Sequence, residues 1–219
     1  MADTGSLREL RARELTTLRE RVARRIRLKP LSKRVRRIVG VDVALTPAAP
    51  KVHVCACLMS LPKLEVLEEA IATDEFDPAA YKQLGAVVVV PLMLSVLKML
   101  KRNFDVIVVK EPSRPEHIPT ASFVGVISGK PCFGVIERAT SLAKVAKWDG
   151  ELRAGTVKLR GHKMPLGVIA GHNLDLRDAK ALAKSSAKES RLPDPIYNAG
   201  TRVRAWEKEW KRVNLGRKR

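Results

Sequence analysis

The chain has 219 residues, enough for one globular domain with appendages, and its 45% hydrophobic content is enough to bury a core. The formal net charge of +19 excludes an acidic or neutral surface and favours polyanionic partners. The first residues lack the apolar core of a signal peptide, and no apolar run approaches the ~18 residues of a membrane span. We therefore expect a cytoplasmic protein. Cys55, Cys57 and Cys132 match no zinc or disulfide spacing and are expected to be buried thiols.

Most of the positive charge lies in two flanking segments. Residues 1–38 contain 13 Lys/Arg and 4 Asp/Glu, and residues 202–219 contain 8 and 2, whereas the long middle segment is close to balanced. Counterion release from a phosphate backbone explains such one-signed segments better than solubility does. Solvated helices and an anionic membrane surface remain open alternatives. The expected phosphate contacts are Arg24, Arg25, Arg36, Arg37, Arg202, Arg204, Lys211 and Arg212.

The first half of the chain predicts a helix followed by a strand meander. Residues 6–28 carry apolar side chains at intervals of three to five with arginines between them, which predicts an amphipathic helix that ends before Pro30. Three strands follow, and the short proline-containing links between them favour antiparallel pairing. These strands are expected at 37–43, 52–59 and 63–70.

The second half predicts a parallel half-sheet. Three almost wholly apolar strands are expected at 85–91, 104–109 and 131–136, with helices at 92–102 and 121–128 between them. The fold class is therefore α/β, with a mixed sheet formed by an antiparallel meander followed by βαβαβ and helices on both faces. Further strands are expected at 156–160 and 165–169, and further helices at 174–190 and 201–213.

Seven short segments carry a family resemblance, because their order and spacing match even though each is weak alone. They are GVDV (40–43), PLMLS (91–95), FDVIVV (104–109), ASFVG (121–125), PCFGV (131–135), AGHN (170–173) and RLPDP (191–195). Together they resemble the motifs of the endonuclease V family over about residues 14–200. The resemblance implies a ribonuclease H-like fold, a divalent metal ion and cleavage of nucleic acid near deaminated bases. It divides the chain into a basic helix and linker (1–37), an endonuclease V-like domain (38–200) and a basic helix or tail (201–219).

The departures from the family pattern fall on the residues that would perform the chemistry. Asp42 and His172 match the family motifs, but the second and third metal carboxylates align with Lys98 and Lys110. Glu111 is an alternative candidate for the third carboxylate, although neighbouring strand residues point to opposite faces. The lysine of another family motif is replaced by Glu137. The aromatic wedge and the glycine that flank the family's helix-starting proline are replaced by Val89 and Leu92, which places recognition of a deaminated base in doubt.

These replacements favour binding without cleavage. Mg²⁺ requires several hard oxygen ligands, and ammonium groups facing such a site would repel it. Lys98 and Lys110 are expected to supply the missing positive charge to phosphate, unless they are merely solvated ends of a helix and a strand. His172 is expected to lie near a helix N-terminus, where it either contacts a phosphate or is only a satisfied structural group.

Three functions therefore compete. The first is a nucleic-acid-binding protein, inactive or impaired as an enzyme, within a ribonucleoprotein or another assembly. The second is an active Mg²⁺-dependent nuclease of inosine-containing DNA or RNA in repair, with Asp42, Glu111 and His172 as catalytic residues and Asp42 as the surviving metal ligand. The third is a basic scaffold for protein partners or a membrane surface. No base-reading motif separates DNA from RNA.

Overall fold

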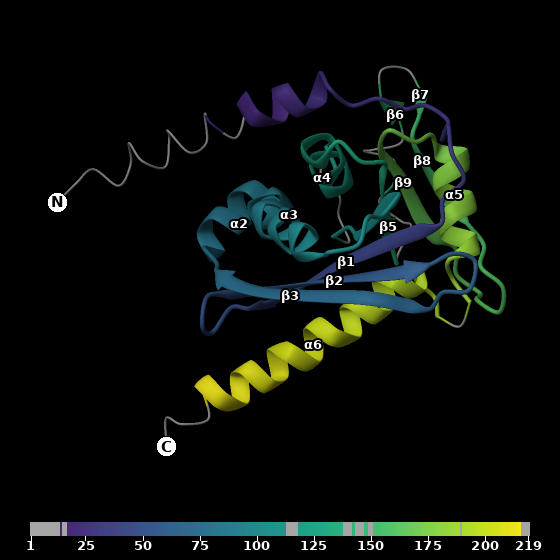
Figure 1. Cartoon of the computed structure of the whole chain (residues 1–219). Helices are drawn as coiled ribbons and strands as arrows, with labels where there is room; N and C mark the ends of the chain where they lie inside the picture. The colour runs from purple at the N-terminus through teal and green to yellow at the C-terminus, as the bar shows by residue number, and fades with distance from the viewer. Residues whose placement is uncertain are drawn as a thin grey trace.

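The structure, a computed structural model, describes residues 14, 17–112, 118–137, 142, 147–148, 151–188 and 190–215. Its centre is a seven-stranded mixed sheet with the strand order β3-β2-β1-β4-β5-β9-β8 (Figure 1). A second pair of two-residue strands, β6 (Lys147–Trp148) and β7 (Glu151–Leu152), lies apart from this sheet. Within the described residues, no helix is both long enough and apolar enough to cross a membrane.

The antiparallel meander is confirmed. β1 (Arg37–Thr46) pairs with β2 (Lys51–Ser60), and β2 pairs with β3 (Val66–Glu75), both in antiparallel register. The third strand lies slightly later than predicted, because residues 61–63 form the turn that precedes it. β2 is buried along nearly its whole length, since helices cover both faces of the sheet at this point.

The parallel part of the sheet begins beside β1. β4 (Val106–Lys110) pairs in parallel with β1, and β5 (Cys132–Ile136) pairs in parallel with β4. β9 (Leu166–His172) and β8 (Ala154–Val157) complete the sheet in antiparallel register. The mixed sheet that the sequence predicts is thereby confirmed.

The strand predicted at 85–91 is wrong, because this segment is helical. Asp77 accepts hydrogen bonds from the backbone N–H groups of Ala79 and Ala80 and so caps α2 (Pro78–Leu84). A 3₁₀ turn, η1 (Gly85–Val89), then leads directly into α3 (Val90–Met99). The run of valines has high strand propensity, but burial of Val87, Val89 and Val90 against the sheet overrides it.

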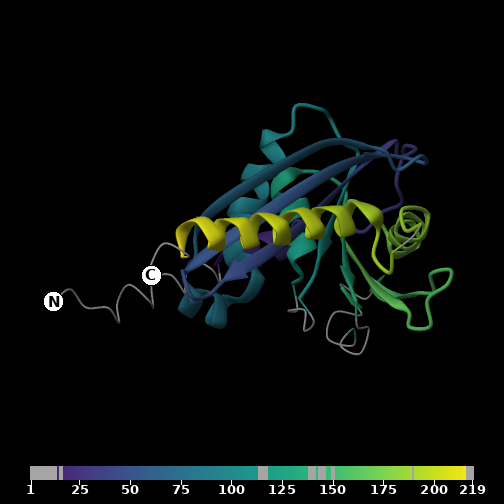
Figure 2. The same cartoon turned by 90° about the horizontal axis from the view of Figure 1, so that it is seen from below.

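The helices form two layers, one on each face of the sheet. α3 and α4 (Thr120–Ser128) cover one face, and the helical residues 17–23 lie on the same side, with Val22 buried in the same cluster. α5 (Leu176–Ser185) and α6 (Asp194–Asn214) cover the other face, where α6 runs across β1 and β2 (Figure 2). We call these two sides the α3/α4 face and the α6 face.

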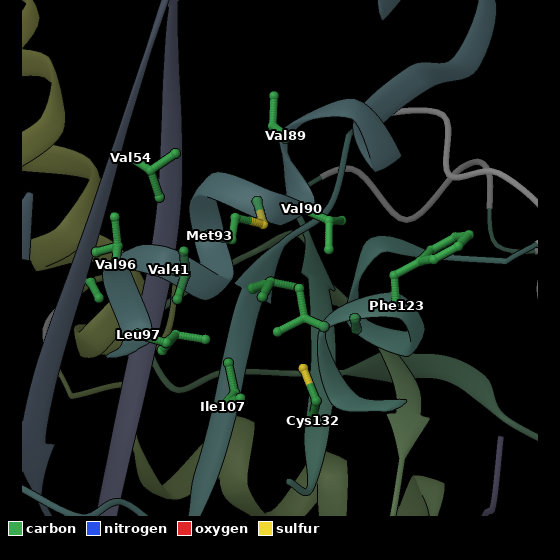
Figure 3. Packing of buried hydrophobic residues seen from close by; sticks show 14 of the residues in the cluster. Val41, Val54, Val89, Val90, Met93, Val96, Leu97, Ile107, Phe123 and Cys132 are labelled. Atoms are coloured by element: carbon green, nitrogen blue, oxygen red, sulfur yellow. The ribbon is translucent and has the colours of Figure 1, made fainter. Parts of the chain in front are cut away.

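The core of the α3/α4 face is aliphatic, as the composition predicts. Valines of β1 and β2 meet Met93, Val96 and Leu97 of α3, and Phe123 of α4 and Ile107 of β4 belong to the same cluster (Figure 3). Cys132 lies in this cluster, and Cys55 and Cys57 are buried on the α6 face. All three cysteines are therefore buried free thiols, as expected, and burial raises the pKa of Cys55 and of Cys57 to about 12.

α6 begins seven residues earlier than predicted and packs unusually close to the sheet. Its first turn lies directly over Gly40, where any Cβ atom would overlap the backbone of Pro195. The helix then runs without interruption through residues 200 and 201, and Ala199 and Val203 both pack against β2. α5 is shorter than predicted, and the helical residues near the N-terminus end at 23 rather than 28, while residues 6–13, 15 and 16 lie outside the described part.

Candidate functional site

The alternation of side chains along β4 decides which charged residues meet. Val108 packs in the cluster of the α6 face and Val109 in that of the α3/α4 face, so Lys110 points toward α6 and Glu111 toward α4. The parallel register pairs Val41 with Val109, so Asp42 and Lys110 are the next residues on neighbouring strands. Asp42 and Lys110 therefore lie on the same face, and Glu111 lies on the other.

Asp42 is a buried carboxylate with two kinds of neighbour. One oxygen accepts a hydrogen bond from the backbone N–H of Val43 at 2.8 Å, and the other lies 3.7 Å from the guanidinium of Arg204 on α6. Gly200 leaves room for it, because a Cβ at this position would lie 2.5 Å from the carboxylate. Burial raises the pKa of Asp42, while the charges of Lys110 and Arg204 act in the opposite direction.

Lys110 forms an ion pair with the residue that follows β5. Its ammonium nitrogen lies 2.7 Å from the carboxylate of Glu137, and both side chains are partly exposed. This hydrogen bond is the main reason that the pKa of Glu137 is lowered. The family pattern has an acid at the position of Lys110 and a lysine at the position of Glu137. In the structure these two residues, which the resemblance identifies as departures from the family pattern, form one ion pair.

A pocket of about 720 Å³ opens beside this pair. Arg191, whose guanidinium donates to the backbone carbonyl of Glu137, forms one wall, and Tyr197 and Arg204 of α6 form another. The remaining lining residues are Lys110, Glu137, His162, Ser190, Leu192, Asp194 and Asn198. Three cations therefore face one concave space that adjoins Asp42.

Glu111 performs a structural role on the opposite face. Its two carboxylate oxygens accept hydrogen bonds from the backbone N–H groups of Thr120 and Ala121, at 3.0 and 2.7 Å, at the start of α4. The side chain is buried, and burial raises its pKa although these N–H groups and the nearby charge of Arg153 oppose the rise. Glu111 therefore does not replace the missing third carboxylate beside Asp42, because the pleat of β4 points it away.

His172 also lies away from Asp42. It is the last residue of β9 and pairs with Cys132 at the start of β5, whereas Glu137 follows the end of β5, about 16 Å along the strand. The ring is buried on the α3/α4 face, and its Nδ1 accepts a hydrogen bond from the backbone N–H of Arg27. Burial, with Arg27 and Lys29 nearby, lowers the pKa of His172. The three residues expected to share a nuclease site are not brought together.

Lys98 lies outside the site for a different reason. It is an exposed residue of the last turn of α3, whose neighbours Val96 and Leu97 point into the core of the α3/α4 face. The helical phase therefore directs Lys98 into solvent rather than toward the sheet. Of the two lysines expected near Asp42, only Lys110 is there.

The N-terminal basic segment reaches both sides of the sheet, because Val22 packs on the α3/α4 face whereas Leu31 and Val35 pack on the α6 face. Arg24 and Arg25, which follow the N-terminal helical residues, are exposed, as are Arg36 and Arg37 at the start of β1. The four cations of α6 that were expected to contact phosphate are exposed too, and each of these four has an acidic partner. The ion pairs are Arg202 with Glu69, Arg204 with Asp42, Lys211 with Glu207 and Arg212 with Glu209.

The residues around Asp42 do not fit a divalent metal ion. Within the part of the chain that the structure describes, no group of three or more His, Cys, Asp or Glu side chains is arranged to hold one. The positive charges of Lys110 and Arg204 both act on Asp42, which is the carboxylate that would have to bind the ion. A unit positive charge ~4 Å from a divalent ion costs about 8 kcal/mol at an effective dielectric of about 20. Two such cations therefore disfavour the ion strongly.

Comparison with known proteins agrees with this fold. The Endonuclease V family model matches residues 20–201. Endonuclease V of Gloeobacter violaceus is 28% identical over 182 residues, covering 75% of this chain and 74% of the relative. The crystal structure of Endonuclease V from Bacillus subtilis superposes with a TM-score of 0.78 at 19% identity, over 93% of this chain and 94% of that one. Endonuclease V of Ciona intestinalis, solved with a 24mer DNA containing inosine, gives 0.77 at 19% identity, covering 92% and 99%.

The sheet order, the helices on both faces and these superpositions define a ribonuclease H-like α/β protein. Because the family model spans well over half of its length, the chain belongs to the endonuclease V family. The resemblance seen in the seven motifs is thereby confirmed.

Signals for two parts of the site were present in the sequence. Lys110 and Glu137 each differ from the family pattern, which the sequence shows. Because they lie at the ends of two neighbouring parallel strands, at one edge of the sheet, their proximity could have been predicted. Arg204 was identified only as a flanking cation. Arg191 and Tyr197 were missed, because their place depends on how the start of α6 packs over Gly40.

Proposed function

We propose that this chain binds nucleic acid on the α6 face of its sheet and does not cleave it. The observation that carries the proposal is the Lys110–Glu137 ion pair beside Asp42, in which a fixed ammonium group takes the place of a metal-binding carboxylate. Membership of a nuclease family, two strongly basic flanking segments and a pocket with three cations support nucleic acid as the partner.

The proposed site replaces metal charge with side-chain charge. In a nuclease of this kind the metal would neutralise phosphate and polarise the attacking water. Lys110, Arg191 and Arg204 can neutralise phosphate by hydrogen bonds from cationic nitrogens, and the planar fork of an arginine matches phosphate oxygens well. Positively charged ammonium and guanidinium groups are hydrogen-bond donors without an acceptor, so they cannot take a proton from water to make a hydroxide nucleophile. Binding is therefore retained, whereas hydrolysis is not supported.

Parallel binding and cleavage assays test the proposal. Labelled plain and inosine-containing DNA and RNA are incubated with the protein, with and without Mg²⁺ or Mn²⁺, and compared with Asp42→Ala. We expect a complex whose affinity falls at least tenfold between ~50 and ~200 mM salt, and no cleavage above the level of the variant. Nicking that depends on metal and disappears in Asp42→Ala would instead establish the alternative, an active endonuclease.

An exchange variant sharpens the same test. Lys110→Asp combined with Glu137→Lys restores the charge order that the family pattern has at the two positions of this ion pair. We expect this double variant to gain measurable Mn²⁺ binding by calorimetry relative to the wild type, with the single variant Glu137→Lys as the control. Equal Mn²⁺ binding by the wild type and the double variant would show that Lys110 is not what excludes the ion.

Salt also separates nucleic-acid binding from a scaffold role. A complex built on phosphate contacts weakens steeply with ionic strength, whereas an apolar protein interface hardly changes. Pull-down from cells at rising salt, followed by sequencing of the bound DNA and RNA, therefore tests the partner class. Recovery of protein partners alone, unchanged at high salt, would favour the scaffold.

A further inference from the structure

The first turns of α6 place an exposed aromatic ring at the pocket. Tyr197 is 50% exposed, whereas its neighbour Ile196 and the following Ala199 are completely buried against the sheet. The ring therefore lies on the outer side of the helix and is not required to fill the core. The side chain of Trp206 on the same helix is also exposed, but its indole N–H donates to the hydroxyl of Thr73 and so fixes it to the sheet.

Cations adjoin this ring within the same pocket. Arg204 lies seven residues, or two helical turns, after Tyr197 on the same side of α6, and Arg191 and Lys110 complete the cationic part of the wall. Arg204 contacts Asp42 through one nitrogen at 3.7 Å, and 56% of its side chain is exposed. The guanidinium therefore still has donors available to a ligand that enters the pocket.

The combination defines the chemical class of the ligand. A pocket of about 720 Å³ lies within the size range of small-ligand sites, and it offers an aromatic face beside phosphate-binding cations. Every nucleobase has a flat π-face that can stack on a tyrosine, but in a duplex both faces of each base are already covered by neighbouring bases. A single tyrosine ring beside cations is therefore suited to bind single-stranded nucleic acid, whose bases are free to stack on it.

We propose that Tyr197 is a stacking platform for an unpaired nucleobase, and that the pocket selects single-stranded over double-stranded nucleic acid. This inference rests on the proposed function, since it names the form of nucleic acid that the same face of the sheet would bind. The phosphate next to the stacked base lies against Arg204 and Arg191. DNA and RNA share this chemistry, because stacking and phosphate contacts do not involve the 2′-hydroxyl group.

Fluorescence anisotropy with three matched ligands tests the inference. A single-stranded DNA, a single-stranded RNA of the same sequence and a blunt duplex are titrated with the wild type, Tyr197→Ala and Tyr197→Phe. Loss of one base–aromatic stack is expected to weaken single-strand binding roughly 5- to 150-fold in Tyr197→Ala, and Tyr197→Phe should keep the affinity. Duplex binding should change much less. Met99→Ala, a control that removes a side chain of similar exposure at the end of α3, should change neither.

The outcomes distinguish this inference from the function on which it rests. If the wild type binds nucleic acid but Tyr197→Ala binds single strands within about twofold of the wild type, the stacking role is wrong while the proposed function stands. If the wild type binds no nucleic acid, or cleaves it, the proposed function itself fails. A second readout is photo-crosslinking of a bromouracil-containing strand, with the crosslinked peptide mapped by mass spectrometry. Crosslinks at Tyr197 support the platform, and crosslinks confined to the α3/α4 face overturn it.

Discussion

Two carboxylates lie next to the same end of β4, on opposite faces of the sheet, and their surroundings differ completely. On the α3/α4 face, Glu111 is held by backbone N–H groups at the start of α4 and is closed off from solvent. On the α6 face, Asp42 is paired with side-chain cations that also line an open pocket. A carboxylate whose hydrogen bonds are all made to buried backbone N–H groups stabilises the fold and cannot interact with a ligand. Exposed cationic side chains that pair with a carboxylate can instead bind a phosphate that enters the pocket. For this reason we place the candidate site on the α6 face.

The largest effect on stability is expected from removing Glu111, the carboxylate of the α3/α4 face. Glu111→Ala removes both acceptors of the first α4 N–H groups and leaves the buried Arg153 without its nearby opposite charge. We expect a loss of about 3–5 kcal/mol in the free energy of unfolding, measured by urea denaturation. Glu65→Ala, which removes an exposed partner of Lys63, should cost almost nothing. A loss below about 1 kcal/mol for Glu111→Ala would show that α4 does not depend on this carboxylate.

A second variant removes charge from the opposite face. Lys110→Ala breaks a partly exposed ion pair with Glu137 and should change the free energy of unfolding by less than about 1 kcal/mol. Nucleic-acid affinity should instead fall roughly tenfold, since a hydrogen bond to a charged group is lost. The slope of log affinity against log salt should decrease by about one. A large stability loss with unchanged affinity would reverse the roles assigned to the two faces.

The protonation of Asp42 gives a third, smaller effect. Burial raises the pKa of Asp42, so the folded state binds this proton more readily than the unfolded state. The resulting stabilisation of the folded state is fully present below the pKa of Asp42 in the unfolded chain, about 4. It is lost as the pH rises through the pKa of Asp42 in the folded protein. Asp42→Asn lacks it. The stability of the wild type relative to this variant should therefore increase as the pH falls from about 7 to about 4.

Denaturation curves for the wild type and Asp42→Asn at several pH values measure this difference, and groups common to both proteins cancel. A relative stability that falls with decreasing pH would mean that Lys110 and Arg204 outweigh burial and lower the pKa of Asp42. The sign of the slope therefore shows whether burial or ion pairing dominates at this carboxylate.

The smallest effect is expected at the lysine that the structure separates from the site. Lys98 is exposed on the last turn of α3, and no ion pair ties it to the described residues. Lys98→Ala should change stability by less than about 0.5 kcal/mol and affinity far less than Lys110→Ala does. Anisotropy titration of the two variants side by side measures this contrast. Equal losses of affinity would place a phosphate contact on the α3/α4 face as well.

Apolar patterns predicted most of the sheet but not every element on it. The meander and strands β4, β5 and β9 follow from runs of buried aliphatic residues, since both faces of the sheet are covered. The valine run at 87–90 satisfied the same pattern and is helical, because a short apolar segment does not reveal its period. The start of α6 was missed since Asp194 and Pro195 were read as part of a family motif rather than as a helix start.

The site was predictable only where strand geometry alone decides. Asp42 and Lys110 meet because β1 and β4 are parallel neighbours, and the family resemblance had already assigned both residues to one site. The positions of Arg204 and Tyr197 depend on how closely α6 approaches the sheet, which is a property of tertiary packing. His172 was misplaced because a motif gives the order of residues but not the register of an antiparallel strand.

Gly40 makes the pocket vulnerable at a position that no ligand touches. Because Gly40 has no Cβ atom, the first turn of α6 can pass directly over it. Any larger side chain at this position would collide with the backbone of Pro195. Such a collision would tilt one rigid helix and so displace Tyr197 and Arg204 together, without altering either residue. A screen for variants that lose binding should therefore recover substitutions of Gly40 as well as substitutions of the pocket residues. Gly40 would control the width of the pocket through the position of α6, without touching the ligand.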